Sequence, residues 1–235
     1  MVSSALPIAG DLDDLSGIVT ETDEPVDNVF SEKQQRLLTY PLLECWSGPP
    51  QLDGKPVPFL AMANVGLFFA RGVPPLVPDA LLSVGVEQLR DPFPTEGRSY
   101  FTWVYGQPPS VVIEVVSNAR GGELSDKLRR YERIGVPRYV VYDPERHLDA
   151  EPLHIFSTVG GQLQEQSNGR FPDLGLELIL WEGFFEQVRG TWLRWATLDG
   201  TLIATAADEH ARAESEKQRA DALAAKLRAL GVEPD

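Results

Sequence analysis

The chain has 235 residues, of which 43% are hydrophobic and 24% charged, so it suits one globular domain with extensions or at most two domains. Its formal net charge of −14 argues against a protein that simply coats nucleic acid. No run approaches the roughly 18 apolar residues of a membrane helix, and the N-terminus has no basic n-region of a secretory signal. A single cysteine, Cys45, allows no intrachain disulfide, and with three scattered histidines it makes no zinc-type cluster. We therefore expect a cytoplasmic protein.

The charge is unevenly distributed. Residues 1–32 carry eight acids and no base, and the non-periodic, acidic segment 1–26 is predicted to be a largely disordered tail. Residues 117–138 carry six bases against three acids. This basic strip permits a phosphate ligand, although a solvated helix face would have the same composition.

A helix is predicted over residues 27–38, because Phe30, Leu37 and Leu38 share one face and Pro41 follows. Short apolar segments punctuated by glycine and proline then predict strands at 59–63, 65–70, 77–84 and 100–105.

Residues 110–117, SVVIEVVS, form the strongest predicted strand. A helix over 123–134, stopped by Gly135 and Pro137, and a strand over 138–142 follow. A β-rich extension is then predicted, with a hairpin around Gly160–Gly161 and strands at 176–180, 191–196 and 201–205. This order predicts an α+β fold with a mixed sheet over residues 27–205.

Residues 206–235 form a separate C-terminal segment with a predicted helix. Leucines and alanines recur on one heptad seam, which two glutamates interrupt: Ala206, Glu209, Ala213, Glu216, Ala220, Leu223, Leu227 and Leu230. Two interpretations stay open, a short coiled coil that would make a homodimer and an amphipathic helix that lies on its own domain.

Glu114 is the most unusual residue of the predicted sheet. Apolar residues on both faces of its strand indicate a central strand covered on both sides. Burying an unpaired carboxylate costs several kcal/mol or raises its pKa until it is neutral. A cation, a basic side chain or solvent must therefore compensate, and a structural Glu–Arg pair or a wet strand end would also do so.

Lys127 falls inside the apolar stripe of the following helix, beside Leu124 and Tyr131 at about 100° per residue. It is thus a natural partner for Glu114, unless its stem packs and its amine reaches water. Asp79 precedes Ala80 in another predicted strand, where aspartate is unusual, and a Pro–Asp turn is the alternative. Two carboxylates and a lysine suit Mg²⁺, which takes one or two carboxylates together with waters and a phosphate.

The string PPSVVIEVVSNARGGELSDKLRRYERIGVPRYVVYDP, preceded by LVPDALLSV, resembles the Uma-two family of restriction-endonuclease-like proteins in the PD-(D/E)XK nuclease superfamily. The similarity runs from about residue 57 to about residue 200. The matching features are Pro78–Asp79, Glu114 to Ser117, Lys127, Tyr131, Gly135 to Pro137, Tyr139 and Asp143–Pro144.

The resemblance implies a restriction-endonuclease-like core in which Asp79 and Glu114, with the Val115 carbonyl as a third ligand, hold Mg²⁺ or Mn²⁺. It implies that Lys127 is the catalytic base or charge stabiliser. The superfamily's usual lysine position, two residues after the acid, is Val116 here. Glu32 or Gln35 of the first helix could add a ligand.

The leading hypothesis is therefore a Mg²⁺-dependent endonuclease that hydrolyses DNA phosphodiester bonds. Three arginines are candidate phosphate contacts: Arg120, Arg129 and Arg130. An inactive nuclease-fold interaction protein that assembles through its C-terminal helix is the alternative. A carboxylate-pair glycosidase is a third reading, against which the lysine and the lack of an aromatic-rich stretch beside the acids count.

Overall fold

A computed structural model describes residues 28–49, 55–89, 91, 93, 97–118 and 120–229. The predicted disordered tail, residues 1–26, lies outside the described residues. Among those that are described, no helix combines the length and apolar character needed to cross a bilayer.

A six-stranded sheet forms the centre of the molecule, in the order β1-β3-β5-β6-β7-β8. The strands are β1 Phe59–Ala63, β3 Ala80–Val84, β5 Val111–Val115, β6 Arg138–Tyr142, β7 Leu153–Val159 and β8 Gln162–Gln166. Strands β5 and β6 run parallel, and the other neighbours pair antiparallel. The predicted α+β fold with a mixed sheet is confirmed.

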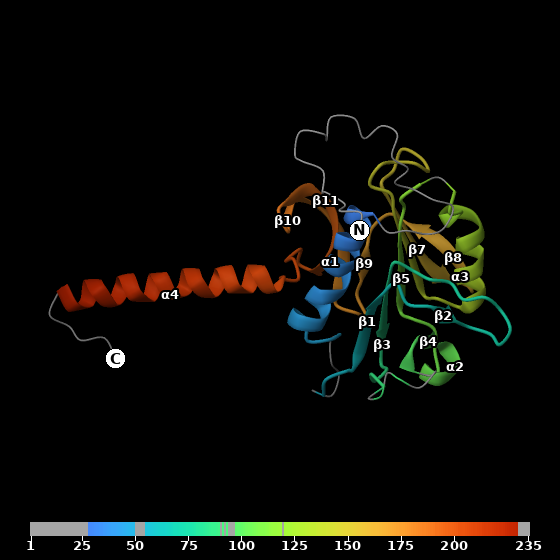
Figure 1. The fold of residues 1–235 in the computed structure, drawn as a ribbon, viewed down its shortest axis with the longest axis horizontal. Coiled ribbons are helices and arrows are strands. Elements are labelled where there is room, and N and C mark those ends of the chain that lie inside the picture. Colours follow the sequence, from blue (N-terminus) through green and yellow to red (C-terminus); the bar gives the residue numbers. More distant parts are fainter. Residues whose placement is uncertain are drawn as a thin grey trace, which may run out of the picture.

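Helices cover both faces of this sheet (Figure 1). Helix α1, Val29–Cys45, lies on one face, together with a second sheet of β9 Arg170–Phe171, β10 Leu176–Phe185 and β11 Val188–Thr197. Helix α3, Leu128–Ile134, covers the other face. The sheet is thus buried on both sides, as the apolar residues on both faces of β5 require.

The prediction that the first helix ends before Pro41 is wrong, because α1 continues to Cys45 with Pro41 inside it. Proline supplies no N–H to its own helical turn. The indole N–H of Trp195 donates to the Leu38 carbonyl at 2.9 Å, and the side chain of Gln34 bonds both backbone groups of Leu193. Contacts with β11 therefore hold the helix where its local sequence would end it.

Several other predicted boundaries are corrected. The strand expected over 65–70 is reduced to β2 Leu67–Phe68, and that over 100–105 to β4 Tyr100–Phe101, followed by the short helix α2 Thr102–Tyr105. Instead of a strand over 201–205 there is a single bridge between Ala196 and Leu202. The helix predicted over 123–134 begins as a π-helix, η2 Glu123–Lys127.

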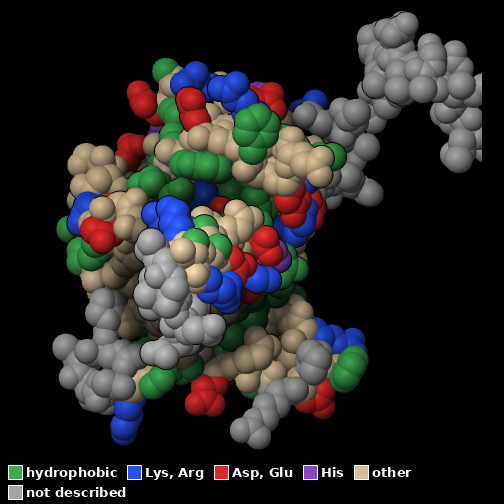
Figure 2. Space-filling view, turned by 90° about the vertical axis from the view of Figure 1, so that its left-hand side faces the viewer, with side chains coloured by type: hydrophobic (Ala, Val, Ile, Leu, Met, Phe, Trp, Pro, Cys, Tyr) green, Lys and Arg blue, Asp and Glu red, His purple; other side chains and the backbone are tan. Residues whose placement is uncertain are grey.

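Helix α4, Ala206–Ala229, projects away from the body of the molecule (Figure 1). Its described side chains are exposed, except for the half-buried Ala224, and Leu223 is 60% exposed. Acidic and basic side chains lie next to one another on the face from which it projects (Figure 2). The interpretation that this helix lies on its own domain is therefore wrong.

Candidate metal and catalytic site

Glu114 lies on β5, where side chains alternate between two buried clusters. Val111, Ile113 and Val115 enter the cluster under α1, whereas Val112 and Val116 enter the cluster under α3. Glu114 belongs to the α3 side and is only 2% exposed. The predicted central strand is confirmed, and its carboxylate is buried in protein rather than placed at a wet strand end.

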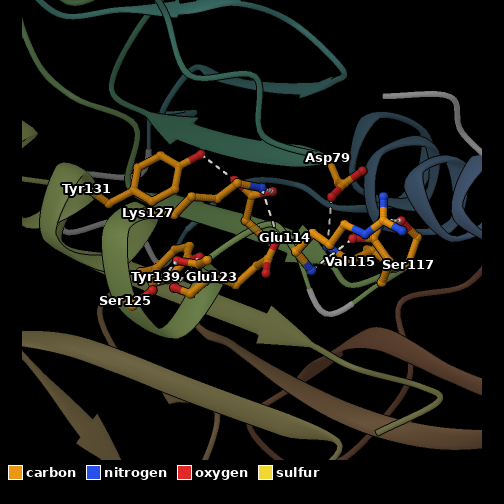
Figure 3. Close-up of polar contacts among 12 residues, drawn as sticks. Asp79, Glu114, Val115, Ser117, Glu123, Ser125, Lys127, Tyr131 and Tyr139 are labelled. Carbon is orange, nitrogen blue, oxygen red and sulfur yellow. Dashed lines mark hydrogen bonds and ion pairs between the residues drawn. The ribbon is translucent and has the colours of Figure 1, made fainter. Parts of the chain in front are cut away.

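Two side chains of the η2–α3 segment reach the Glu114 carboxylate (Figure 3). The Tyr131 hydroxyl donates a hydrogen bond to Oε1 at 2.6 Å, and the Lys127 ammonium Nζ lies 2.9 Å from Oε2. The predicted inward lysine is thus a direct partner of Glu114. An arginine pair is not what compensates this carboxylate.

Lys127 bridges two buried acids. Its Nζ lies 3.1 Å from Oε1 of Glu123 as well as 2.9 Å from Glu114. Burial lowers the pKa of Lys127, but the charges and hydrogen bonds of the two glutamates outweigh burial and leave that pKa above its ordinary value. The two glutamates therefore favour the charged form of the Lys127 amine.

Asp79 immediately precedes β3, so the interpretation of a turn before the strand is right for its backbone. Ala80 pairs with Ile113, so Asp79 stands one step further along, opposite Glu114. Its Oδ2 accepts the Val115 N–H at 2.7 Å, and its Oδ1 accepts the Gln35 side-chain amide at 2.8 Å. Both bonds hold the carboxylate beside β5.

The Glu114 carboxyl is harder to ionise than an ordinary glutamate. Burial raises its pKa from 4.5 to about 7; the Lys127 charge opposes this shift, and the Asp79 charge adds to it. The cost of ionising Glu114 next to Asp79 is what a bound cation would remove.

A divalent ion fits the donors that are present. The described residues contain no group of three or more His, Cys, Asp and Glu side chains that could hold a metal. Asp79 and Glu114 are two acids of this site that could act as ligands, with the Val115 carbonyl, waters or a phosphate completing the shell. Mg²⁺ is commonly held in this way, by one or two carboxylates and several waters.

The three arginines predicted to contact phosphates have other partners in the structure. Arg129, on the outer side of α3, pairs with Asp126 at 2.6 Å. Arg130 donates to the Pro74 carbonyl at 3.2 Å, and the backbone N–H of Arg120 donates to the Asn118 side chain at 2.9 Å. Contact of these arginines with phosphates stays a prediction.

Sequence reasoning did not assign Tyr131 or Glu123 to the site. Tyr131 was counted as an apolar helix position, although its hydroxyl needs a partner when buried. Glu123 stands four residues before Lys127 and directly follows Gly121 and Gly122, a spacing that could have indicated the pair. Of the two candidates on α1, Gln35 reaches Asp79, whereas Glu32 pairs with Arg36.

The mixed sheet with helices on both faces agrees with the restriction-endonuclease-like fold that the family match indicates. The model of the Uma2 family, described as "Putative restriction endonuclease", matches residues 25–185, more than half of the chain. The chain belongs to this family. A comparison with curated proteins finds no match.

Proposed function

We propose that this protein is a divalent-metal-dependent endonuclease that hydrolyses phosphodiester bonds of DNA. The observation that carries the proposal is the buried Glu114 carboxylate, which stands opposite Asp79 and lies 2.9 Å from the Lys127 ammonium. Family membership supports a nuclease, and the metal, the substrate and the residue roles are the proposal's own content.

Each residue has a definite task in this proposal. Asp79 and Glu114, with the Val115 carbonyl, hold Mg²⁺ or Mn²⁺, which would activate a water and offset negative charge on the phosphate. Lys127 stabilises the charge that develops on the attacked phosphate and orients the water. Tyr131 and Gln35 hold the two carboxylates in place through the bonds described above. Arg120, Arg129 and Arg130 contact flanking phosphates of the DNA.

A cleavage assay tests the proposal. Supercoiled and linear DNA, single-stranded DNA and RNA are incubated with the full chain and with Mg²⁺, Mn²⁺ or chelator. Metal-dependent cleavage of DNA by the wild type, lost in Glu114→Gln and in Lys127→Ala, is the expected result. Glu214→Gln, which removes an exposed acid of α4, serves as the charge-matched control. Cleavage that survives both site substitutions would rule out this site.

A second candidate function, assembly through α4, is favoured by the exposure of this helix. A 24-residue helix extends about 36 Å, and most helices in proteins gain their stability from packing an amphipathic face, which α4 leaves exposed over most of its length. We propose that a second copy of the chain covers its seam in an antiparallel coiled coil. A parallel pair would place Glu209 and Glu216 against their own copies, whereas an antiparallel pair brings Glu216 close to Arg219 of the second copy.

Cysteine cross-linking distinguishes the arrangements. In a Cys45→Ser background, Ala213→Cys links to its own copy only in a parallel pair. The antiparallel arrangement instead predicts that Glu216→Cys chains link to Ala220→Cys chains. Light scattering of the wild-type chain measures its molecular mass in solution. A monomer at all concentrations would exclude assembly through α4.

A further inference from the structure

The turn that carries Lys127 is a π-turn. The Lys127 N–H donates to the Gly122 carbonyl, five residues back, at 3.0 Å, and η2 spans Glu123–Lys127 before the regular helix α3 begins. π-Turns are rare and are frequently found at functional sites. Here the turn directs both Glu123 and Lys127 inward, under the helix and toward β5.

Glu123 is held inward by its surroundings. Its side chain is 7% exposed, and the Tyr139 hydroxyl donates to its backbone carbonyl at 3.1 Å. A Cβ atom at Gly121 would collide with the Glu123 carboxylate, so glycine at this position leaves the space that the carboxylate fills. The sequence Gly121–Gly122–Glu123 thus builds a pocket for one acid beside the Lys127 amine.

Only one of the two oxygens of the Glu123 carboxylate has a hydrogen-bond partner among the described residues. Oε1 accepts from Lys127, whereas the buried Oε2 has no hydrogen-bond partner among the described residues. A buried carboxylate oxygen without a partner costs free energy. Glu123 is thus a second acid on an amine that already lies 2.9 Å from Glu114.

We infer that Glu123 is a positioning residue that keeps the Lys127 ammonium in the site when Glu114 turns to a divalent cation. The inference rests on the proposed function. In the present structure both Glu114 oxygens accept hydrogen bonds, one from Tyr131 and one from Lys127. An ion bound by Glu114 would compete with Lys127 for that carboxylate and would repel the ammonium. Glu123, whose carboxylate has Lys127 as its hydrogen-bond partner among the described residues, would supply the anchor that remains.

Three variants of the full chain test this assignment. Glu123→Gln keeps the shape and removes the charge, Gly121→Ala displaces the same carboxylate without changing it, and Glu114→Gln removes the proposed ligand. Calorimetry measures the affinity for Mn²⁺, and steady-state cleavage of DNA at saturating Mn²⁺ measures kcat and KM. Glu214→Gln again provides the control.

The expected result separates binding from turnover. Glu123→Gln and Gly121→Ala lower kcat by about 10- to 100-fold, a typical cost of losing a supporting contact, while the Kd for Mn²⁺ and the KM for DNA change by less than about twofold. Glu114→Gln loses Mn²⁺ binding. Loss of Mn²⁺ binding in Glu123→Gln as well would make Glu123 a ligand and overturn the inference, as would an unchanged kcat in both anchor variants.

A crystal structure with Mn²⁺ decides the case in which the wild type binds the ion but cleaves no DNA. The proposed function would then fail, whereas Lys127 still within hydrogen-bond distance of Glu123, with Glu114 on the ion, would support the anchor. Lys127 turned to solvent would overturn it. If the wild type binds no Mn²⁺, Glu114 never exchanges Lys127 for an ion, and both the proposed function and the role of Glu123 are overturned.

Discussion

The two faces of the central sheet are both buried, but they are built from different chemistry. On the α1 side, Ile113 and its neighbours pack into a cluster of aliphatic and aromatic side chains that includes Leu178 and Trp195. On the α3 side the same strand presents Glu114, surrounded by Lys127, Tyr131 and further polar groups. The face under α1 is buried against apolar side chains, whereas part of the face under α3 is buried in a network of polar side chains.

This difference teaches where function is to be sought. Apolar burial contributes about 25 cal/mol per Å² and has no directional requirement, whereas a buried carboxylate is tolerable only when its partners are in place. The network under α3 is therefore sensitive to geometry, and the apolar face is sensitive to volume. Four substitutions or conditions test this contrast.

Glu114→Gln should have the largest effect. Because it removes a charged ligand and keeps the shape, we expect Mn²⁺ affinity and DNA cleavage each to fall by at least about 100-fold. The folded structure should persist, since the amide oxygen can accept from Lys127 and the amide NH2 can donate to the Tyr131 hydroxyl oxygen. Calorimetry and cleavage assays measure the losses, and wild-type Mn²⁺ affinity in the variant would contradict the proposed site.

Ile113→Ala, the neighbouring position on the opposite face, should act on stability instead. Truncating a side chain that is 1% exposed should lower the free energy of unfolding by about 3 kcal/mol, through lost burial and a cavity. Urea unfolding measures the loss. Mn²⁺ affinity of the folded protein should stay near that of the wild type, and a fall as large as in Glu114→Gln would deny that the faces act separately.

Tyr131→Phe should have a moderate effect on the polar face. It removes the hydroxyl that donates to Oε1 of Glu114 and leaves the ring packing against Tyr139. We expect Mn²⁺ affinity to fall about tenfold, as for other residues that orient a metal ligand. Tyr139→Phe, which removes a hydroxyl bound to a backbone carbonyl, is the matched comparison. Equal effects of the two variants would argue against a specific role of Tyr131.

The smallest expected effect is the pH dependence of the free energy of unfolding that His154 causes. His154 lies on β7 and pairs with Val141 of β6, which in turn pairs with Glu114. Burial lowers the pKa of His154, but Glu165 and Asp149 outweigh it and raise that pKa above 6.5. The folded state therefore binds the proton more tightly than the unfolded state. This stabilisation is complete below pH 6.5 and is lost as the pH rises through the folded pKa. Urea unfolding at pH 6 and pH 8.5 should show a smaller decline in His154→Gln than in the wild type. A decline that remains in the variant is expected from Glu114, whose pKa is raised to about 7 in the folded state.

Much of the central region follows from local sequence. The strand around Glu114, the inward position of Lys127 and the hairpin at Gly160–Gly161 were predictable, because side-chain alternation, helical periodicity and glycine turns are local properties. Partners that lie far apart in the chain were not. No local pattern shows that the Gln35 side chain donates to Asp79, or that α1 continues beyond Pro41 while it is hydrogen-bonded to β11.

By itself, the sequence determined that an acid stands in the middle of an apolar strand and that a lysine turns inward from the next helix, because both follow from periods of two and 3.6 residues. Only the tertiary structure decided which groups surround that acid. The order of the strands sets Asp79 opposite Glu114, and one π-turn brings a second glutamate to the lysine. The pairing of β3 with β5 joins segments distant in the chain, and the π-turn departs from the regular helical period, so neither follows from periods of two or 3.6 residues.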